Sequence, residues 1–302
     1  MFKSVLILVA TLFFISGCGG ATAPQSLPLS PSQSQMKTIN ISNSKGTAFS
    51  SFKSIFGNGI NPTNGFSARV VDGKKIAKPS FRVALNVAKL LKVSSKQCEN
   101  GSGSVDVNEI VPNQKYDVTF HNCSFTQQDY YGNNQYYTYN GNIKLESLGN
   151  DQYKEEFDHL SIKTDNSQQF NITKATAIIN ANTSETSFTH MYAKFSAPSI
   201  KTEYLNMNIT VKVLSDSSID YTVAGYVKSC NGGYVYFKTN PKVHFDNYDE
   251  TNNSGDITIS SKGKQLTVTF TTDGVYLLDV DGYTTTYTYD EYFDLIEGTT
   301  CN

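Results

Sequence analysis

Most of the chain alternates apolar and polar residues with the period of two that is typical of β-strands. The segment KYDVTFHNC, residues 115–123, places Tyr116, Val118 and Phe120 on one side of such a strand. The segment KQLTVTF, residues 264–270, repeats the pattern with Leu, Val and Phe. Many further runs between them are rich in Thr, Val, Ile and Tyr, the residue types that fit a pleated, half-buried surface.

Turn-forming residues separate these strand-like runs. Asp281-Gly282 lies between two such runs, which predicts a tight hairpin, and YYGNNQYY, residues 130–137, predicts another turn between tyrosine-rich arms. The segments suggest about 10–12 antiparallel strands. The expected fold class is therefore mainly β, as one large antiparallel sheet or a sandwich, with one or two N-terminal helices packed against it.

Two stretches before the strands have helical spacing instead. In GTAFSSFKSIFGNG, residues 46–59, Phe49, Phe52 and Phe56 fall on one side and Gly57 is suited to end the helix. KPSFRVALNVAKLLKVSSK, residues 78–96, is a stronger pattern, with apolar residues on one face and basic residues on others. Such a helix can lie on a membrane, but packing against the sheet is the favoured interpretation.

The first residues have the form of an export signal. One positive charge at Lys3 precedes a short apolar run that is too brief to span a bilayer. The run ends in Ile15-Ser16-Gly17-Cys18, which resembles the lipobox of bacterial lipoproteins. The alternative is an ordinary signal peptide that contains a cysteine.

The lipobox resemblance implies that Cys18 becomes the acylated first residue of the mature chain. The acyl chains would then hold the protein on a membrane. Gly19 and Gly20 follow, and neither is the Asp that favours the inner membrane in lipoproteins of enteric bacteria. We therefore expect a lipid anchor in the cell outer membrane, facing the periplasm or the surface, with the outer face of the plasma membrane as the alternative.

These patterns predict four parts. Residues 1–17 form the signal peptide, and residues 18–45 form the acylated cysteine and a flexible Ser-, Pro- and Gln-rich tether. Residues 46–97 form a helical segment, and residues 98–302 form the antiparallel β domain.

The overall charge narrows the class of partner. Charged residues make up 17% of the chain and the formal net charge is −2, which argues against nucleic acid as a partner. Basic residues gather between Arg69 and Lys96, and acidic ones between Asp246 and Glu297. Two solvated faces are the simplest explanation.

Four cysteines remain after Cys18, and an even number in an exported chain predicts two disulfides. Three connectivities exist, and pairing in sequence order closes the shortest loops: Cys98 with Cys123, and Cys230 with Cys301. A zinc site is the alternative, but no CxxC or HxxxH spacing supports it.

The mature part also resembles the layout of uncharacterised bacterial exported proteins. A predicted helix is followed by CENGSGSVDV, then YDVTFHNCSF and YNGNIKLES. The resemblance favours the Cys98–Cys123 pairing and implies no activity.

Candidate ligand-binding chemistry is sparse. The tyrosines Tyr130, Tyr131, Tyr136 and Tyr137 are candidates for a stacking platform for sugar or peptide, although tyrosine is also a normal strand residue. No cofactor is expected beyond the acyl group on Cys18. A calcium ion is a weak alternative in one acidic loop, which contains Asp246, Asp249, Glu250 and Asp256.

No catalytic motif supports an enzyme. The four histidines lie without a near partner at ligand spacing. Glu155, Glu156 and Asp158 could supply a carboxylate pair for glycosidic chemistry, but no pattern in the sequence places them in a pocket. The favoured function is a lipid-anchored envelope lipoprotein with a structural or binding role, with the membrane, an envelope protein or an apolar ligand as partner. A periplasmic carrier of an apolar ligand and an envelope hydrolase are the alternatives.

Overall fold

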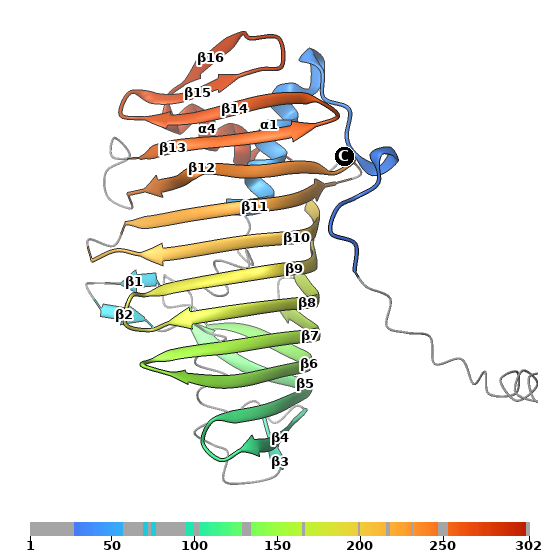
Figure 1. The fold of residues 1–302 in the computed structure, drawn as a ribbon, viewed down its shortest axis with the longest axis vertical. Helices are drawn as coiled ribbons and strands as arrows, with labels where there is room; N and C mark the ends of the chain where they lie inside the picture. Colours follow the sequence, from blue (N-terminus) through green and yellow to red (C-terminus); the bar gives the residue numbers. More distant parts are fainter. Residues whose placement is uncertain are drawn as a thin grey trace, which may run out of the picture.

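The computed structural model describes residues 27–56, 69–71, 74–76, 95–98, 103–128, 134–164, 167–198, 200–215, 218–230, 232–246 and 253–299. Fourteen strands form one antiparallel sheet in which each strand pairs with the next in the chain, from β3 to β16. Figure 1 shows the strands stacked in chain order along the long axis of the molecule. The bounds are β3 Ser95–Gln97, β4 Ser104–Val111, β5 Lys115–Gln128, β6 Asn134–Gly149, β7 Gln152–Thr164, β8 Gln169–Asn180, β9 Glu185–Ala197, β10 Ile200–Val213, β11 Ile219–Ser229, β12 Val235–Phe245, β13 Ser254–Ser261, β14 Lys264–Thr271, β15 Gly274–Leu278 and β16 Thr284–Tyr287.

The predicted fold class, mainly β with a large antiparallel sheet, is confirmed. Of the two predicted architectures, the described residues form the single sheet and not the sandwich. The alternating residues Val118 and Phe120 of β5, and Leu266 and Val268 of β14, lie in the core. The sheet has more strands than the expected 10–12, because short strands such as β3 carry too few residues to show an alternation. A separate two-stranded sheet pairs β1 Arg69–Val71 with β2 Lys74–Ile76.

A line of irregularities crosses the long strands near their middle. In β5, Phe120 and Cys123 are both buried, while His121 and Asn122 between them are exposed. The pairing register of β5 with β6 shifts at the same place. Two successive outward residues lengthen the polar side of a strand, so each bulge bends its strand toward the apolar face.

We call this line the crease. It combines bulges with residues of positive φ, which are non-glycine residues in some strands and glycine in others. The pairing register shifts there between β5 and β6, β6 and β7, β8 and β9, β9 and β10, and β11 and β12. The residues of positive φ along it are Asn122, Gly141, His159, His190, Asn206, Gly225 and Gly255. The sheet therefore has a polar outer face and an inner face that is bent inward and apolar.

The first predicted helix is present, as α1 Ile41–Phe56, and packs against β11 and β14. It lies behind the upper strands in Figure 1. Phe49 and Phe52 are buried and Phe56 packs against the core, as their spacing predicts. The second predicted helix, 78–96, lies outside the described residues except for its last two positions, which belong to β3.

A C-terminal helix, α4 Tyr289–Glu297, corrects the expectation that only strands follow Cys98. Thr288 caps its start, accepting a hydrogen bond from Glu291 N at 3.2 Å, and Thr288 N donates to Glu291 Oε2 at 2.9 Å. Tyr292 is fully buried on its inner side. The capping pattern Thr-x-x-Glu was readable from the sequence, but the tyrosines and threonines before it also fit a strand.

Aromatic rings fill the space between the two helices and the C-terminal strands. The Tyr292 ring lies 5.5 Å from those of Phe49 and Phe52 and 5.9 Å from that of Phe270, all in edge-to-face geometry. Such pairs add stabilisation beyond the burial of their surface. The inner face is thus occupied by packed side chains at this end of the sheet.

Residues 29–39, which we call the strap, lie along the sheet before α1 begins. Asn206 Nδ2 donates to Leu29 O at 3.0 Å, and Lys37 N donates to Tyr234 O at 2.9 Å. Ile39 is buried. The tether was expected to extend to residue 45, whereas helix α1 starts at Ile41.

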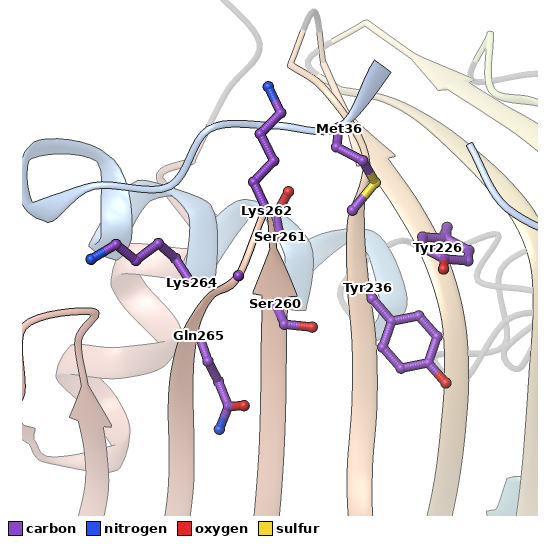
Figure 2. A pocket seen from close by; sticks show the side chains of 9 residues that line it. Met36, Tyr226, Tyr236, Ser260, Ser261, Lys262, Lys264 and Gln265 are labelled. Atoms are coloured by element: carbon purple, nitrogen blue, oxygen red, sulfur yellow. The ribbon is translucent and has the colours of Figure 1, made fainter. Parts of the chain in front are cut away.

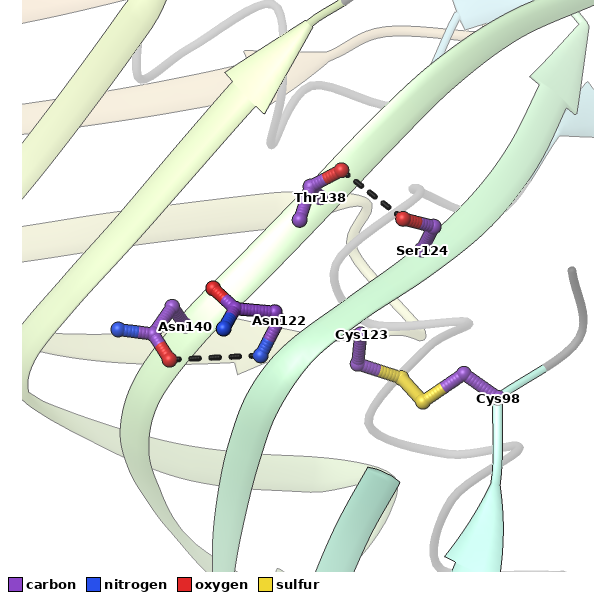
Figure 3. Close-up of a disulfide and its surroundings, with 6 residues drawn as sticks. All are labelled: Cys98, Asn122, Cys123, Ser124, Thr138 and Asn140. Atoms are coloured by element: carbon purple, nitrogen blue, oxygen red, sulfur yellow. Dashed lines mark hydrogen bonds between the residues drawn. A yellow bond between two sulfur atoms is a disulfide. The ribbon is translucent and has the colours of Figure 1, made fainter. Parts of the chain in front are cut away.

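A disulfide joins Cys98 to Cys123, as the pairing in sequence order predicts (Figure 3). It links the end of β3 to β5 across the intervening β4. Cys230 is also disulfide-bonded, and its expected partner Cys301 lies outside the described residues. Among the helices that the structure describes, none combines the length and apolarity needed to cross a bilayer.

Candidate functional site

Four side chains line up across the outer face where β11 to β14 pair. Tyr226 pairs with Tyr236, Tyr236 with Ser260, and Ser260 with Gln265. We call these four residues the transverse row. Each occupies a polar position of its strand, next to a buried residue such as Val227 or Val235. Because side chains alternate between the two faces of a strand, the four residues point to solvent.

The two tyrosines of the row form a close aromatic pair. Their ring centroids lie 5.1 Å apart with an interplanar angle of 62°. Both side chains are half-buried, so part of each ring stays open to a ligand. Tyrosine offers an apolar ring face together with a hydroxyl that donates and accepts hydrogen bonds.

A pocket of about 400 Å³ lies over the transverse row. Its volume falls within the range of sites for small ligands. Figure 2 shows Met36 above the row and the hairpin between β13 and β14 beside it. The lining residues are Met36, Tyr226, Tyr236, Ser260, Ser261, Lys262, Gly263, Lys264 and Gln265.

The strap holds Met36 in the wall of this pocket. Met36 forms a parallel bridge to Tyr234, and Tyr234 N donates to Gln35 O at 2.9 Å. Ser261 Oγ donates to Lys37 O, and Lys262 Nζ donates to Thr38 Oγ1 at 3.2 Å. The pocket is therefore built from two segments that are far apart in the sequence.

The hairpin that borders the pocket is a tight turn with two residues of positive φ. Lys262 has φ 48° and Gly263 has φ 76°, the combination that suits the twist of the two strands. Lys262 and Lys264 are exposed, and the pocket lining contains no Asp or Glu. The wall formed by this hairpin is therefore positively charged.

An ion cluster lies on the same face next to the row. Glu203 Oε1 lies 3.5 Å from Lys228 Nζ and 3.8 Å from Lys194 Nζ, and Tyr234 donates its hydroxyl to Glu203 Oε2 at 2.8 Å. Desolvation by burial acts to raise the pKa of Glu203, but the Tyr234 hydrogen bond and the two lysines outweigh it and lower the pKa. Burial and then the bond to Glu203 raise the pKa of Tyr234.

A second cluster lies at Asp220 on β11. Its carboxylate oxygens lie 2.6 Å from Lys242 Nζ and 2.8 Å from His244 Nδ1. Burial acts to raise the pKa of Asp220, but the hydrogen bonds and charges of Lys242 and His244 outweigh it and lower the pKa. Both acidic residues are thus neutralised by basic neighbours on the outer face.

The structure separates two of the tyrosines proposed from the sequence as a platform. Tyr136 is exposed, whereas Tyr137 packs against the hydrophobic core on the other side of β6. Tyr130 and Tyr131 lie outside the described residues. A platform that uses both Tyr136 and Tyr137 would need them on one face of the strand.

The structure describes two of the four acidic residues proposed from the sequence for a calcium loop. Asp246 and Asp256 are described, while Asp249 and Glu250 lie outside the described residues. Within the described ranges, no three or more His, Cys, Asp or Glu side chains gather as a metal site would require. The proposed calcium loop therefore stays a prediction.

The carboxylates considered for glycosidic chemistry point to opposite faces of β7. Glu155 is buried on the inner face, whereas Glu156 lies on the outer face, where its Oε1 is 2.5 Å from Lys154 Nζ. Asp158 pairs with His159 at the crease, with 2.6 Å between Oδ1 and Nδ1. Adjacent residues on a strand alternate between faces, which is why Glu155 and Glu156 cannot share one cleft.

Sequence reasoning did not single out the transverse row. Tyr226 and Tyr236 occur in strand-like segments, where tyrosine is a common residue. The available signal was their phase, since each is a large aromatic residue in the polar phase of an alternating strand. Their register alignment depends on strand pairing, which no local pattern gives.

Comparisons of the chain with known protein families, with curated proteins and with solved structures found no match.

Proposed function

We propose that this chain is a lipid-anchored protein of the cell envelope that binds a carbohydrate-like ligand on the outer face of its sheet and carries out no catalysis. The observation that carries the binding role is the transverse row in its pocket, where two tyrosine rings adjoin a serine and a glutamine. Ring faces can pack on the apolar face of a sugar, while hydroxyl and amide groups bond to its hydroxyls.

The envelope location is supported by the lipobox at Ile15 to Cys18 and by the disulfide between Cys98 and Cys123, a bond typical of oxidising compartments. The strap adds a limit on distance. Cys18 and Leu29 are 11 positions apart, so the chain between them spans no more than about 40 Å. Leu29 O accepts a hydrogen bond from Asn206 of β10, which lies at the crease. An anchor at Cys18 would therefore keep the outer face of the sheet near the lipid surface.

The alternative of an apolar carrier draws less support from the inner face. Between α1, α4 and the C-terminal strands, Phe49, Phe52, Phe270 and Tyr292 fill the interior. A carrier needs open space lined by apolar groups rather than a packed core. The polar outer face is the better candidate for ligand binding.

The test is calorimetry of the full chain in detergent micelles against a panel of envelope oligosaccharides. We expect one or more to bind, and Tyr236→Ala to weaken binding at least about tenfold, because the substitution removes a ring from the row. Tyr236→Phe keeps the ring and should retain most of the affinity. Tyr276→Ala is the matched control, since Tyr276 is a half-buried tyrosine on β15 outside the pocket. Equal losses for Tyr236→Ala and Tyr276→Ala, or no binding, would reject the proposal.

A further inference from the structure

We propose that the pocket over the transverse row selects sugars that carry a negative charge, such as the uronic acid units of an acidic oligosaccharide. The inference rests on the proposed function, because it names the ligand class of the same pocket. Two independent features of the described residues support it: the charge of the pocket wall and the charge of the surrounding face.

The pocket wall contains basic side chains and no acidic ones. Lys262 and Lys264 extend from the hairpin, with their ammonium ends directed away from the two tyrosines (Figure 2), and none of the nine lining residues is Asp or Glu. Lys262 is partly engaged with the strap through Thr38 Oγ1 at 3.2 Å. A carboxylate held at the Gln265 end of the row, next to the hairpin, would therefore lie beside basic side chains and no acidic one.

The surrounding face is also basic, although the whole chain has a formal net charge of −2. Apart from the two lysines of the pocket wall, strands β10 to β13 carry five lysines and three acidic residues. The lysines are Lys201, Lys212, Lys228, Lys238 and Lys242, and the acids are Glu203, Asp220 and Asp256.

Basic neighbours already neutralise two of these three acids. Glu203 lies between Lys194 and Lys228, and Asp220 between Lys242 and His244. The excess of lysine charge thus creates a positive potential around the pocket, which attracts anionic ligands and weakens as salt concentration rises. The same excess would discriminate against a neutral sugar of equal shape.

The two features have separate roles in recognition. The tyrosine rings and the Ser260 and Gln265 side chains fit any sugar of suitable shape, so they supply affinity without charge selectivity. Lys262 and Lys264 add the discrimination for charge. Substitution of the tyrosines should therefore weaken the binding of charged and neutral ligands alike, whereas substitution of the lysines should weaken only the charged ones.

The experiment compares oligogalacturonate with its uncharged methyl ester as probes of the full chain in detergent micelles. We expect the acidic form to bind at least about tenfold more tightly at low salt, and this ratio to shrink as salt is added. Lys262→Gln/Lys264→Gln should lower the preference to the part that the surrounding face supplies. Lys264→Gln alone should reduce it, and this single variant leaves the strap contact of Lys262 intact. Lys174→Gln on β8 is the matched control, since Lys174 is exposed on the outer face outside the pocket.

The outcomes separate this inference from the proposed function. Equal binding of both probes would overturn the acidic ligand class while leaving a sugar-binding pocket. A preference that the double lysine substitution leaves unchanged would overturn the role of the pocket wall in selecting the charge. Binding of neither probe would overturn the inference itself, and failure of the wider oligosaccharide panel would overturn the function as well. Vesicles containing anionic lipids form a further arm, and binding to these alone would assign the positive face to the membrane instead.

Discussion

Gly141 on β6 lies directly against the backbone carbonyl of His159 on β7. Gly141 has φ +124°, His159 has φ 50°, and a Cβ atom added to Gly141 would lie well inside contact distance of His159 O. A glycine thus faces a bulged neighbour at the crease. Gly225 is in the same position against the bulge of β10, where an added Cβ would reach 2.6 Å from Met207 Cα.

We predict that Gly141→Ala lowers the free energy of unfolding by about 2 kcal/mol or more, because both the positive φ and the contact with His159 O oppose a side chain. Urea unfolding followed by circular dichroism measures the change. The matched control is Gly46→Ala in α1, where nothing lies within 4 Å of the added Cβ. That substitution should stabilise the protein by about 0.5–1 kcal/mol, because alanine is the better helix former. Equal effects of the two substitutions would contradict the steric argument.

The sequence predicts the sheet better than its bend. Val118 and Phe120 alternate as a strand requires, and they are core residues of β5. The shift from Phe120 to Cys123 breaks the alternation, but a local pattern cannot distinguish a bulge from the end of a strand. The bend depends on several such bulges lying side by side, which is a property of the paired strands.

We predict that Cys98→Ala/Cys123→Ala lowers the free energy of unfolding by about 3 kcal/mol, because the bond closes a loop of 25 residues in the unfolded chain. Denaturant unfolding of the two proteins without reductant is the measurement. This design leaves the bonded Cys230 unchanged, which a reducing agent would not. An unchanged midpoint and slope would show that the cross-link contributes no net stability.

We predict that the ion cluster of Asp220 makes the free energy of unfolding fall as the pH becomes acidic. Its pKa is lowered from 3.8, so the carboxylate contributes stability that is present above that value and is lost as the pH falls through the folded-state pKa. Between roughly pH 4 and pH 2, the unfolding free energy of the wild type should therefore fall more steeply than that of Asp220→Asn.

Asp256→Asn on β13 provides the control for this pH series, since Asp256 also lies on the outer face, in a different strand. Thermal unfolding at closely spaced pH values gives the slopes. If Asp220→Asn follows the wild type at every pH, the ion cluster with Lys242 and His244 has no role in acid stability.

We predict that Gly233→Ala releases the strap from the sheet. An added Cβ would lie 2.5 Å from Lys37 N and 2.7 Å from Gln35 O, so the two segments can no longer approach. Hydrogen exchange at the amides of Lys37 and Tyr234 should then accelerate, and Met36 should no longer line the pocket. Gly232→Ala is the control, because its nearest contact is 3.2 Å, to Ser229 O. Unchanged protection in Gly233→Ala would show that the strap does not depend on this close approach.

The transverse row could not be predicted from the sequence. Tyr226 and Tyr236 meet because β11 and β12 pair in one register, and a shift of that register by one residue would place Tyr236 opposite a different residue. Met36 enters the same pocket from a segment that composition assigns to a tether. Both relationships arise from long-range pairing, whereas hydrophobic periodicity and turn signals are local.

We predict that radiolabelled palmitate enters the wild-type protein when it is produced in a bacterium, and that the label is lost in Cys18→Ala. The reason is chemical: only the thiol at the end of the lipobox can form the thioether that carries the diacylglycerol, and two or more acyl chains are needed for stable anchoring. Ser16→Ala serves as the control, since a small residue is kept before the cysteine and labelling should persist. The Cys18→Ala protein should also leave the membrane fraction while retaining the Cys98–Cys123 bond, because that bond depends on export rather than on the anchor. Label retained in Cys18→Ala would place the acyl group elsewhere, and the limit of about 40 Å between the lipid and the outer face would then no longer apply.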